Sequence, residues 1–126
     1  MIKICTSLEQ SKKLLELGID VYTADMFWKN GVSDKYIQCF TPFVNSGTNI
    51  DYDYDIPAWG LSSLLILTPN EILINDEYYY LNLNKTKIEY RGPVTFDGQK
   101  FKSFECNNLV DAAFEMVVWL KENGIL

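Results

Sequence analysis

The chain begins with a short amphipathic pattern that is typical of a surface helix. Four leucines form its apolar positions and four charged residues its polar ones, namely Leu8, Leu14, Leu15 and Leu17 against Glu9, Lys12, Lys13 and Glu16. Thr6 and Glu9 have the spacing of a capping box, and Gly18 suits the left-handed position that follows a helix. The pattern predicts a helix from about Ser7 to Leu17.

A wider apolar arc predicts a helix at the other end of the sequence. One stripe and a second stripe beside it cover much of its surface, namely Leu109, Ala113, Met116, Val117 and Leu120, then Val110, Phe114 and Val118. Asn107 or Asn108 can cap its start, Asp111 favours the first turn, and the helix should end at Lys121–Gly124. The width of the arc predicts that this helix lies on a sheet.

Two prolines bracket a third, central helix. Pro57 suits the first turn of a helix, and Pro69 disfavours helical backbone at the residue before it. We therefore predict a helix of roughly Ala58 to Leu67. Most of its circumference is apolar, so it should be well buried or covered by a partner.

Strand patterns occupy the rest of the chain and are separated by turn residues. Asn30-Gly31 lies between Ala24–Trp28 and Tyr36–Phe43, which predicts a hairpin or a long loop. Further on, the pattern predicts an antiparallel meander, with strands in Glu71–Leu83, Lys87–Arg91, Val94–Phe96 and Lys100–Phe104 and turns at Asn75-Asp76, Asn84–Thr86 and Asp97-Gly98. Alternation along one strand places three side chains toward the core, Tyr79, Leu81 and Leu83, and three away from it, Tyr78, Tyr80 and Asn82.

Together these elements predict an α+β fold. We expect a single domain over residues 1–126, with an antiparallel sheet of about four to six strands and the N-terminal, central and C-terminal helices packed on it. A length of 126 residues, 48% apolar and 22% charged, is typical of one globular domain.

Net charge and cysteine content limit the kinds of partner and the cellular compartment that we expect for this chain. A formal charge of −6 opposes phosphate backbones, so we expect no direct contact with nucleic acid. The longest apolar run is Leu64–Leu67, and no secretory signal is recognised, which predicts neither membrane insertion nor export by that route. Cys5, Cys39 and Cys106 have no metal or disulfide spacing, so we interpret them as buried, reduced thiols of a cytoplasmic protein, with a reactive thiol as the alternative.

The absence of histidine excludes several mechanisms. Ser-His-Asp and Cys-His catalysis and imidazole-based zinc sites all require a residue that this chain lacks. The sequence also contains no phosphate-binding glycine motif and no nucleophile elbow. We therefore expect no cofactor, and the sequence indicates a protein that is not an enzyme.

The densest polar segment is the run of Asp51, Tyr52, Asp53, Tyr54 and Asp55. Its alternating carboxylates resemble the start of an EF-hand loop, but Ile56 replaces the glycine and Ser62 the glutamate that such a loop needs. Three interpretations stay open: a cation site, a solvated acidic loop before a helix, and an acidic contact surface that binds a partner through these residues and Trp59. Phe27, Trp28 and Trp59 fit core packing better than ligand stacking.

Three stretches, Glu9–Gly18 leading to Thr23–Met26, then Ile56–Leu65, then Asn108–Met116, together resemble a family of small uncharacterised proteins of gut anaerobic bacteria, often carried on phage or mobile elements. The resemblance implies a bacterial, cytoplasmic protein and no particular reaction. Relatives often have serine between the tryptophan and leucine of the central stretch. This chain has Gly60, which should loosen the helix start.

The function that fits these patterns is that of an accessory protein binding another protein or a second copy of itself. A variant of this hypothesis lets the acidic surface mimic nucleic acid and block a nucleic-acid-binding protein. The alternative is a small-molecule binder or a carboxylate-dependent enzyme, with its site between the segment 51–59 and the sheet.

Overall fold

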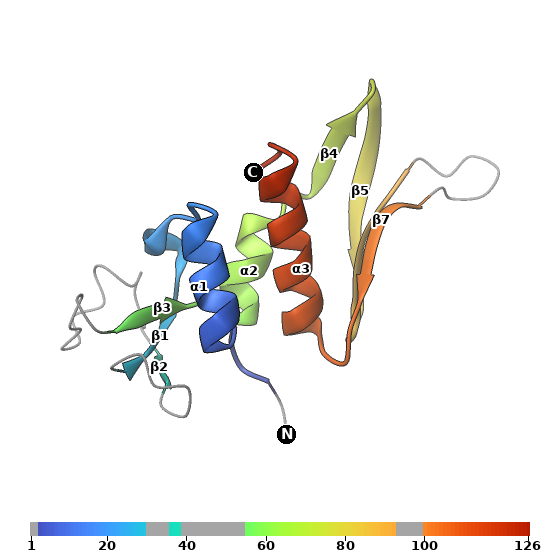
Figure 1. The fold of residues 1–126 in the computed structure, drawn as a ribbon. Helices are drawn as coiled ribbons and strands as arrows, with labels where there is room; N and C mark the ends of the chain where they lie inside the picture. Colours follow the sequence, from blue (N-terminus) through green and yellow to red (C-terminus); the bar gives the residue numbers. More distant parts are fainter. Residues whose placement is uncertain (1–2, 30–35, 39–54, 93–99) are drawn as a thin grey trace.

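The computed structural model describes residues 3–29, 36–38, 55–92 and 100–126 (Figure 1). Along this part of the chain the elements are α1 (Leu8–Glu16), a short 3-10 helix η1 (Val21–Thr23), β1 (Met26–Trp28), β2 (Tyr36–Gln38), β3 (Ile56–Ala58), α2 (Leu61–Leu67), β4 (Glu71–Ile74), β5 (Glu77–Leu83), β6 (Lys87–Arg91), β7 (Lys100–Glu105) and α3 (Leu109–Glu122).

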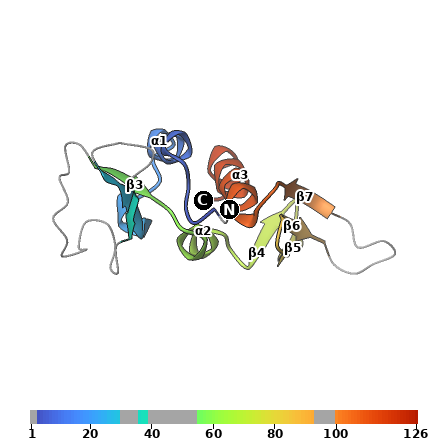
Figure 2. The ribbon, with the colours of Figure 1, turned by 90° about the horizontal axis from the view of Figure 1, so that it is seen from below.

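The predicted α+β class is confirmed, but the described strands form two sheets where we expected one. The first has the order β2-β1-β3 and the second the order β4-β5-β6-β7, with every pair antiparallel. The helices lie between the two sheets (Figures 1 and 2). Because α1 contacts β3 whereas α3 contacts α2, β6 and β7, the helix layer is covered on two sides.

The second sheet is the predicted meander. Asn75 and Asp76 have φ angles of 50° and 67°, and this pair of left-handed residues makes the two-residue turn between β4 and β5. A register shift opposite Tyr90 and Arg91 marks a bulge in the pairing with β7. The predicted strand at Val94–Phe96 and the turns at Asn30-Gly31 and Asp97-Gly98 lie outside the described residues.

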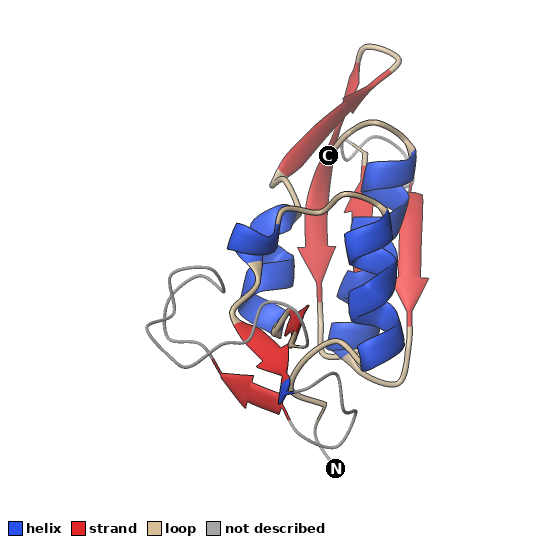
Figure 3. Ribbon diagram, turned by 60° about the vertical axis from the view of Figure 1, so that its left-hand side comes forward, coloured by secondary structure: helices blue, strands red, loops and turns tan. Residues whose placement is uncertain are grey.

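The main core lies between α3 and the second sheet, as the apolar arc predicted. The α3 side chains of Ala113, Met116, Val117 and Leu120 are fully buried, and Ile88 and Tyr90 of β6 lie in the same cluster. Figure 3 shows the helices stacked over one face of the longer strands. Tyr79 is buried as predicted, whereas Leu83 is about half exposed, because β4 does not extend far enough to flank the end of β5.

Two helix starts differ from their prediction. The capping box of α1 is formed by Ser7 and Gln10, one residue later than expected, and Gly18 has the predicted left-handed φ of 82°. The central helix begins at Leu61, because Ile56–Ala58 pairs with β1 as an edge strand, where proline is tolerated. This helix is buried on one side only, since Ile66 is 81% exposed. In the described part of the chain, none of the helices combines the length and apolarity needed to cross a bilayer.

Candidate functional site

Of the acidic segment Asp51–Asp55, the structure describes Asp55 alone. Asp51, Tyr52, Asp53 and Tyr54 lie outside the described residues, so the contact-surface and cation hypotheses for them remain predictions. Asp55 is only 3% exposed, and its Oδ2 lies 3.4 Å from Nζ of Lys29. The interpretation of Asp55 as part of a solvated loop is therefore wrong, because its carboxylate is buried and pairs with Lys29, whose side chain is 33% exposed.

Trp59 is also inaccessible, which removes it from any exposed contact surface. Its side chain is 0% exposed, and its Nε1–H donates a hydrogen bond to Oγ1 of Thr23 at 2.9 Å. Phe27 and Trp28 are buried as well, so the core interpretation of all three aromatic residues is confirmed. Trp59 is therefore not available to a ligand, while the alternative site between the segment 51–59 and the sheet remains a prediction, because residues 51–54 lie outside the described part of the chain.

Thr6, expected to be a helix cap, instead joins the first strand region to the first helix. Its backbone N–H donates to the Trp59 carbonyl at 2.9 Å, and its Oγ1 accepts the Trp59 N–H at 3.0 Å. The same hydroxyl lies 2.8 Å from Oγ of Ser11, and the Thr6 carbonyl accepts from Nε1 of Trp28 at 3.1 Å. These groups are buried and satisfied by one another, which identifies a structural network rather than a reactive one.

Asp25 caps the start of α2 from outside the helix. Its Oδ1 accepts hydrogen bonds from the Gly60 N–H at 2.7 Å and from Oγ of Ser63 at 3.0 Å. A Cβ on Gly60 would lie 3.0 Å from Oδ2 of Asp25, so glycine permits this close approach. Asp25 thus supplies the cap that the N-cap residue Gly60 lacks, at the end of the helix where negative charge is favourable.

The two described cysteines are free thiols with weak acidity. Burial, with the nearby charge of Asp25, raises the pKa of Cys5 to about 11. Burial also raises the pKa of Cys106, helped by the charges of Asp111 and Glu115. Since the thiolate is the nucleophilic form, neither group is activated for catalysis at neutral pH. Cys39 lies outside the described residues.

Within residues 3–29, 36–38, 55–92 and 100–126, no three acidic or cysteine side chains are grouped so that they could hold a metal ion. The buried carboxylates of the described residues, Asp55 and Glu89, are instead paired with basic side chains. Asp55 pairs with Lys29, and Glu89 lies 3.0 Å from Nε of Arg91.

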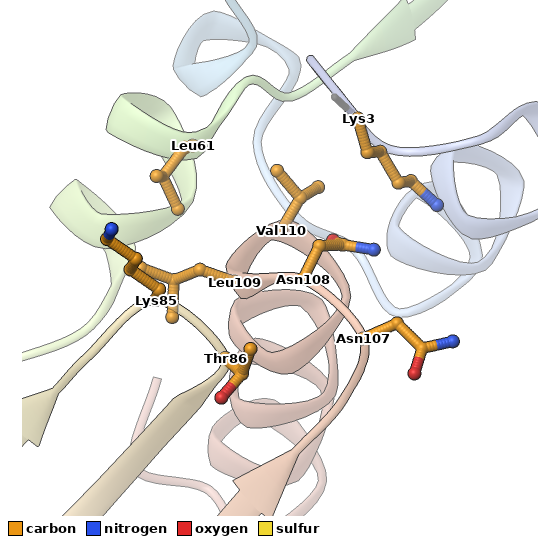
Figure 4. A pocket seen from close by; sticks show the side chains of 8 residues that line it. All are labelled: Lys3, Leu61, Lys85, Thr86, Asn107, Asn108, Leu109 and Val110. Carbon is orange, nitrogen blue, oxygen red and sulfur yellow. The ribbon is translucent and has the colours of Figure 1, made fainter. Parts of the chain in front are cut away.

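A hollow of about 490 Å³ lies between the starts of α2 and α3 and the connection from β5 to β6 (Figure 4). It is lined by Lys3, Leu61, Lys85, Thr86, Asn107, Asn108, Leu109 and Val110. Leu61 and Leu109 project into it from different helices, and its size is that of a small-molecule pocket.

The polar groups of this hollow are largely engaged within the chain. Nζ of Lys3 lies 2.6 Å from Oδ1 of Asp111, and Oδ1 of Asn108 accepts the Asp111 N–H at 2.8 Å as the cap of α3. Its lining includes no carboxylate and no thiol. The hollow can therefore hold an apolar group.

The outer face of β4 and β5 exposes large side chains on a rigid support. Leu73, Tyr78 and Tyr80 are 53%, 49% and 47% exposed, and Leu73 stands opposite Tyr78 in the register. Tyr80 lies between Glu71 on β4 and Arg91 on β6. We call Leu73, Tyr78 and Tyr80 the outer-face cluster. The alternation along β5 predicted that Tyr78 and Tyr80 point away from the core, but no sequence pattern favoured them over the segment 51–59 as a contact surface.

The fold and this surface define an α+β protein with helices between two antiparallel sheets and an aromatic patch on the larger sheet. No protein-family model, curated protein or solved structure matches the chain.

Proposed function

We propose that this chain is a non-enzymatic interaction protein that binds another protein through the outer-face cluster. The observation that carries the proposal is the contrast in burial: Leu73, Tyr78 and Tyr80 are about half exposed, while Trp28 and Trp59 are buried in the chain's own core. An exposed group of large side chains held side by side on paired strands is typical of a contact surface.

The chemistry of the cluster favours a protein partner. A tyrosine ring supplies a large contact area at a low cost in conformational entropy, and its hydroxyl can still form a hydrogen bond. The strands hold Tyr78 and Tyr80 in place before binding, which reduces the entropy lost on association. The partner that fits is a protein with an apolar patch bordered by hydrogen-bond acceptors for the two phenol groups.

The proposal also includes a cellular compartment and the chemical class of the partner. The free thiols of Cys5 and Cys106 fit a reducing compartment such as the bacterial cytoplasm. A net charge of −6 argues against direct binding of nucleic acid and favours a protein partner.

The proposal is tested by comparing two variants in the capture of partners from native lysate. Tyr78→Ser combined with Tyr80→Ser removes both rings from the cluster, whereas Tyr22→Ser removes an exposed ring on η1, outside it. A partner retained by the wild type is then purified and its affinity measured by calorimetry. We expect at least a tenfold weaker affinity for the double variant, and an unchanged affinity for Tyr22→Ser. Equal affinities for all three proteins, or no reproducible partner of the wild type, would refute the proposal.

A further inference from the structure

The strand β4 is an edge of the second sheet with free backbone groups. Its partner in the described part of the chain is β5 alone. Ile74 stands opposite Glu77 beside the two-residue turn, so these residues exchange hydrogen bonds, and so do Ile72 and Tyr79 two positions further. Asn70 continues this alternation, since its carbonyl accepts the Leu81 N–H at 2.9 Å.

The intervening residues, Glu71 and Leu73, therefore direct their N–H and C=O groups away from β5. Nothing in the described part of the chain pairs with that side of β4. Four strong backbone groups are thus arranged along an extended edge, ready to receive another strand.

The two edges of this sheet differ in how they are protected. The sequence of β7 contains Lys100 and Lys102, and its pairing with β6 is interrupted by a register shift. Lysines and bulges are devices that discourage pairing between sheet edges. In contrast, β4 has the sequence Glu-Ile-Leu-Ile, with no lysine, no proline and a regular register.

We propose that β4 pairs antiparallel with β4 of a second copy of this chain, which joins two four-stranded sheets into one sheet of eight strands. Residues opposite each other in an antiparallel pair have side chains on the same face. A two-fold pairing that satisfies this rule places Ile72 opposite Ile72 of the second copy, and Glu71 opposite Leu73. All outward backbone groups of Glu71 and Leu73 are then paired in both copies, in a closed and isologous contact.

Charge and symmetry favour a second copy over an unrelated strand. In this register Glu71 faces a leucine instead of another glutamate. The two-fold axis also places the two hairpin turns, each with Asp76 and Glu77, at opposite ends of the β4–β4 interface. Because each copy carries a net charge of −6, screening by salt should strengthen the association, which is a signature that an apolar peptide ligand would not share.

The test is sedimentation of the full chain at concentrations between about 10 µM and about 1 mM. The wild type should shift from monomer to dimer, at lower concentration when salt is added. Leu73→Pro removes the outward N–H and no bond of the β4–β5 ladder, so the variant should keep its circular dichroism and remain monomeric. The matched control Tyr78→Ser alters the opposite residue, leaves the β4 backbone intact and should still dimerise.

Amide hydrogen exchange gives a second readout that does not depend on the proline variant folding. In the wild type, the amides of Glu71 and Leu73 should exchange fast in dilute protein and slowly in concentrated protein. A wild type that stays monomeric throughout, a folded Leu73→Pro variant that dimerises, or a dimer in which these amides remain unprotected would each overturn the proposal. The partner proposal fails independently, because it concerns the rings of Tyr78 and Tyr80 and not the edge backbone.

Discussion

Two tryptophans beside the three-stranded sheet and two tyrosines on the outer face of the four-stranded sheet differ in burial and in role. Near the three-stranded sheet, Trp28 and Trp59 are buried, and each indole N–H donates a hydrogen bond within the chain, to the Thr6 carbonyl and the Thr23 hydroxyl. On the outer face of the four-stranded sheet, the rings of Tyr78 and Tyr80 remain half exposed. Aromatic abundance in this chain therefore has two causes, internal packing in one region and an available surface in the other.

The largest loss of stability is expected from a substitution in the core, at Trp59. Trp59→Ala leaves a cavity in the core and removes the partner of the Thr23 hydroxyl, and should lower the free energy of unfolding by about 3–5 kcal/mol. Urea denaturation followed by circular dichroism measures this loss. Trp59→Phe keeps most of the apolar volume and should cost clearly less. A loss below about 1 kcal/mol for the alanine variant would contradict the core assignment.

The next effect concerns the polar network behind the aromatic core. Thr6→Val keeps the shape of the side chain but leaves the Ser11 hydroxyl and the Trp59 N–H without their buried partner. The expected loss of stability is about 1–3 kcal/mol, the cost of unsatisfied buried groups. Ser7→Ala, which removes the neighbouring cap of α1, is the control and should cost about 1 kcal/mol. If Ser7→Ala were the more damaging change, Thr6 would not be the centre of the network.

Those two positions also show where local sequence patterns stop being informative. Thr6 and Ser7 are adjacent hydroxyl residues, each followed three positions later by a residue that can complete a capping box, Glu9 or Gln10. The local pattern cannot separate the two possibilities. The bonds between Thr6 and Trp59, far apart in sequence, determine that Ser7 is the cap.

Long-range contacts also determine the structure of the central region and of the predicted site. Pro57 fits both a helix start and an edge strand, and the pairing of Ile56–Ala58 with β1 decides in favour of the strand. This pairing also carries Asp55 into the interior, and no local pattern indicated the burial of that carboxylate, whereas Trp59 was predicted to pack in the core. The division of the strands into two sheets depends on the same long-range contacts.

The elements that were predicted correctly depend on nearby residues only. The two left-handed residues Asn75 and Asp76 determine the β4–β5 turn, and a period of two places Tyr78 and Tyr80 outside. The helical period and the cap Asn108 determine α3.

A smaller, pH-dependent effect is expected at Asp111, which links the N-terminal region to α3. Burial alone would raise the pKa of this carboxyl, but hydrogen bonds from Lys3, Gln10 and Asn108 and the charge of Lys3 outweigh it and hold the pKa below its ordinary value. The stabilisation is therefore complete above about pH 4, where the unfolded carboxyl is also ionised, and is lost as the pH falls through the lowered pKa.

Asp111→Asn tests this linkage. At pH 7 the variant should lose about 1 kcal/mol of stability, because an amide oxygen can still accept from Lys3 and Gln10 but the carboxylate charge and the bond from Asn108 are lost. Its stability should also fall less steeply than that of the wild type below pH 4. Urea titrations between about pH 2 and pH 7 measure both quantities. If the free energy of unfolding fell equally steeply for both proteins below pH 4, Asp111 would not contribute to the pH dependence.

The smallest effect on stability is expected at Tyr80, on the exposed outer face of the four-stranded sheet. Tyr80→Ser removes a ring that is 47% exposed and whose strand neighbours are Glu71 and Arg91, so it should change the free energy of unfolding by about 0.5 kcal/mol or less. Urea denaturation of Tyr80→Ser and Trp59→Ala under the same conditions compares the two losses of stability directly, because both changes delete an aromatic ring. If Tyr80→Ser destabilised the chain by more than about 2 kcal/mol, its ring would be needed for the fold. A small loss of stability together with a large loss of partner affinity assigns the ring to binding, since a residue kept for packing would change the two quantities in the opposite proportion.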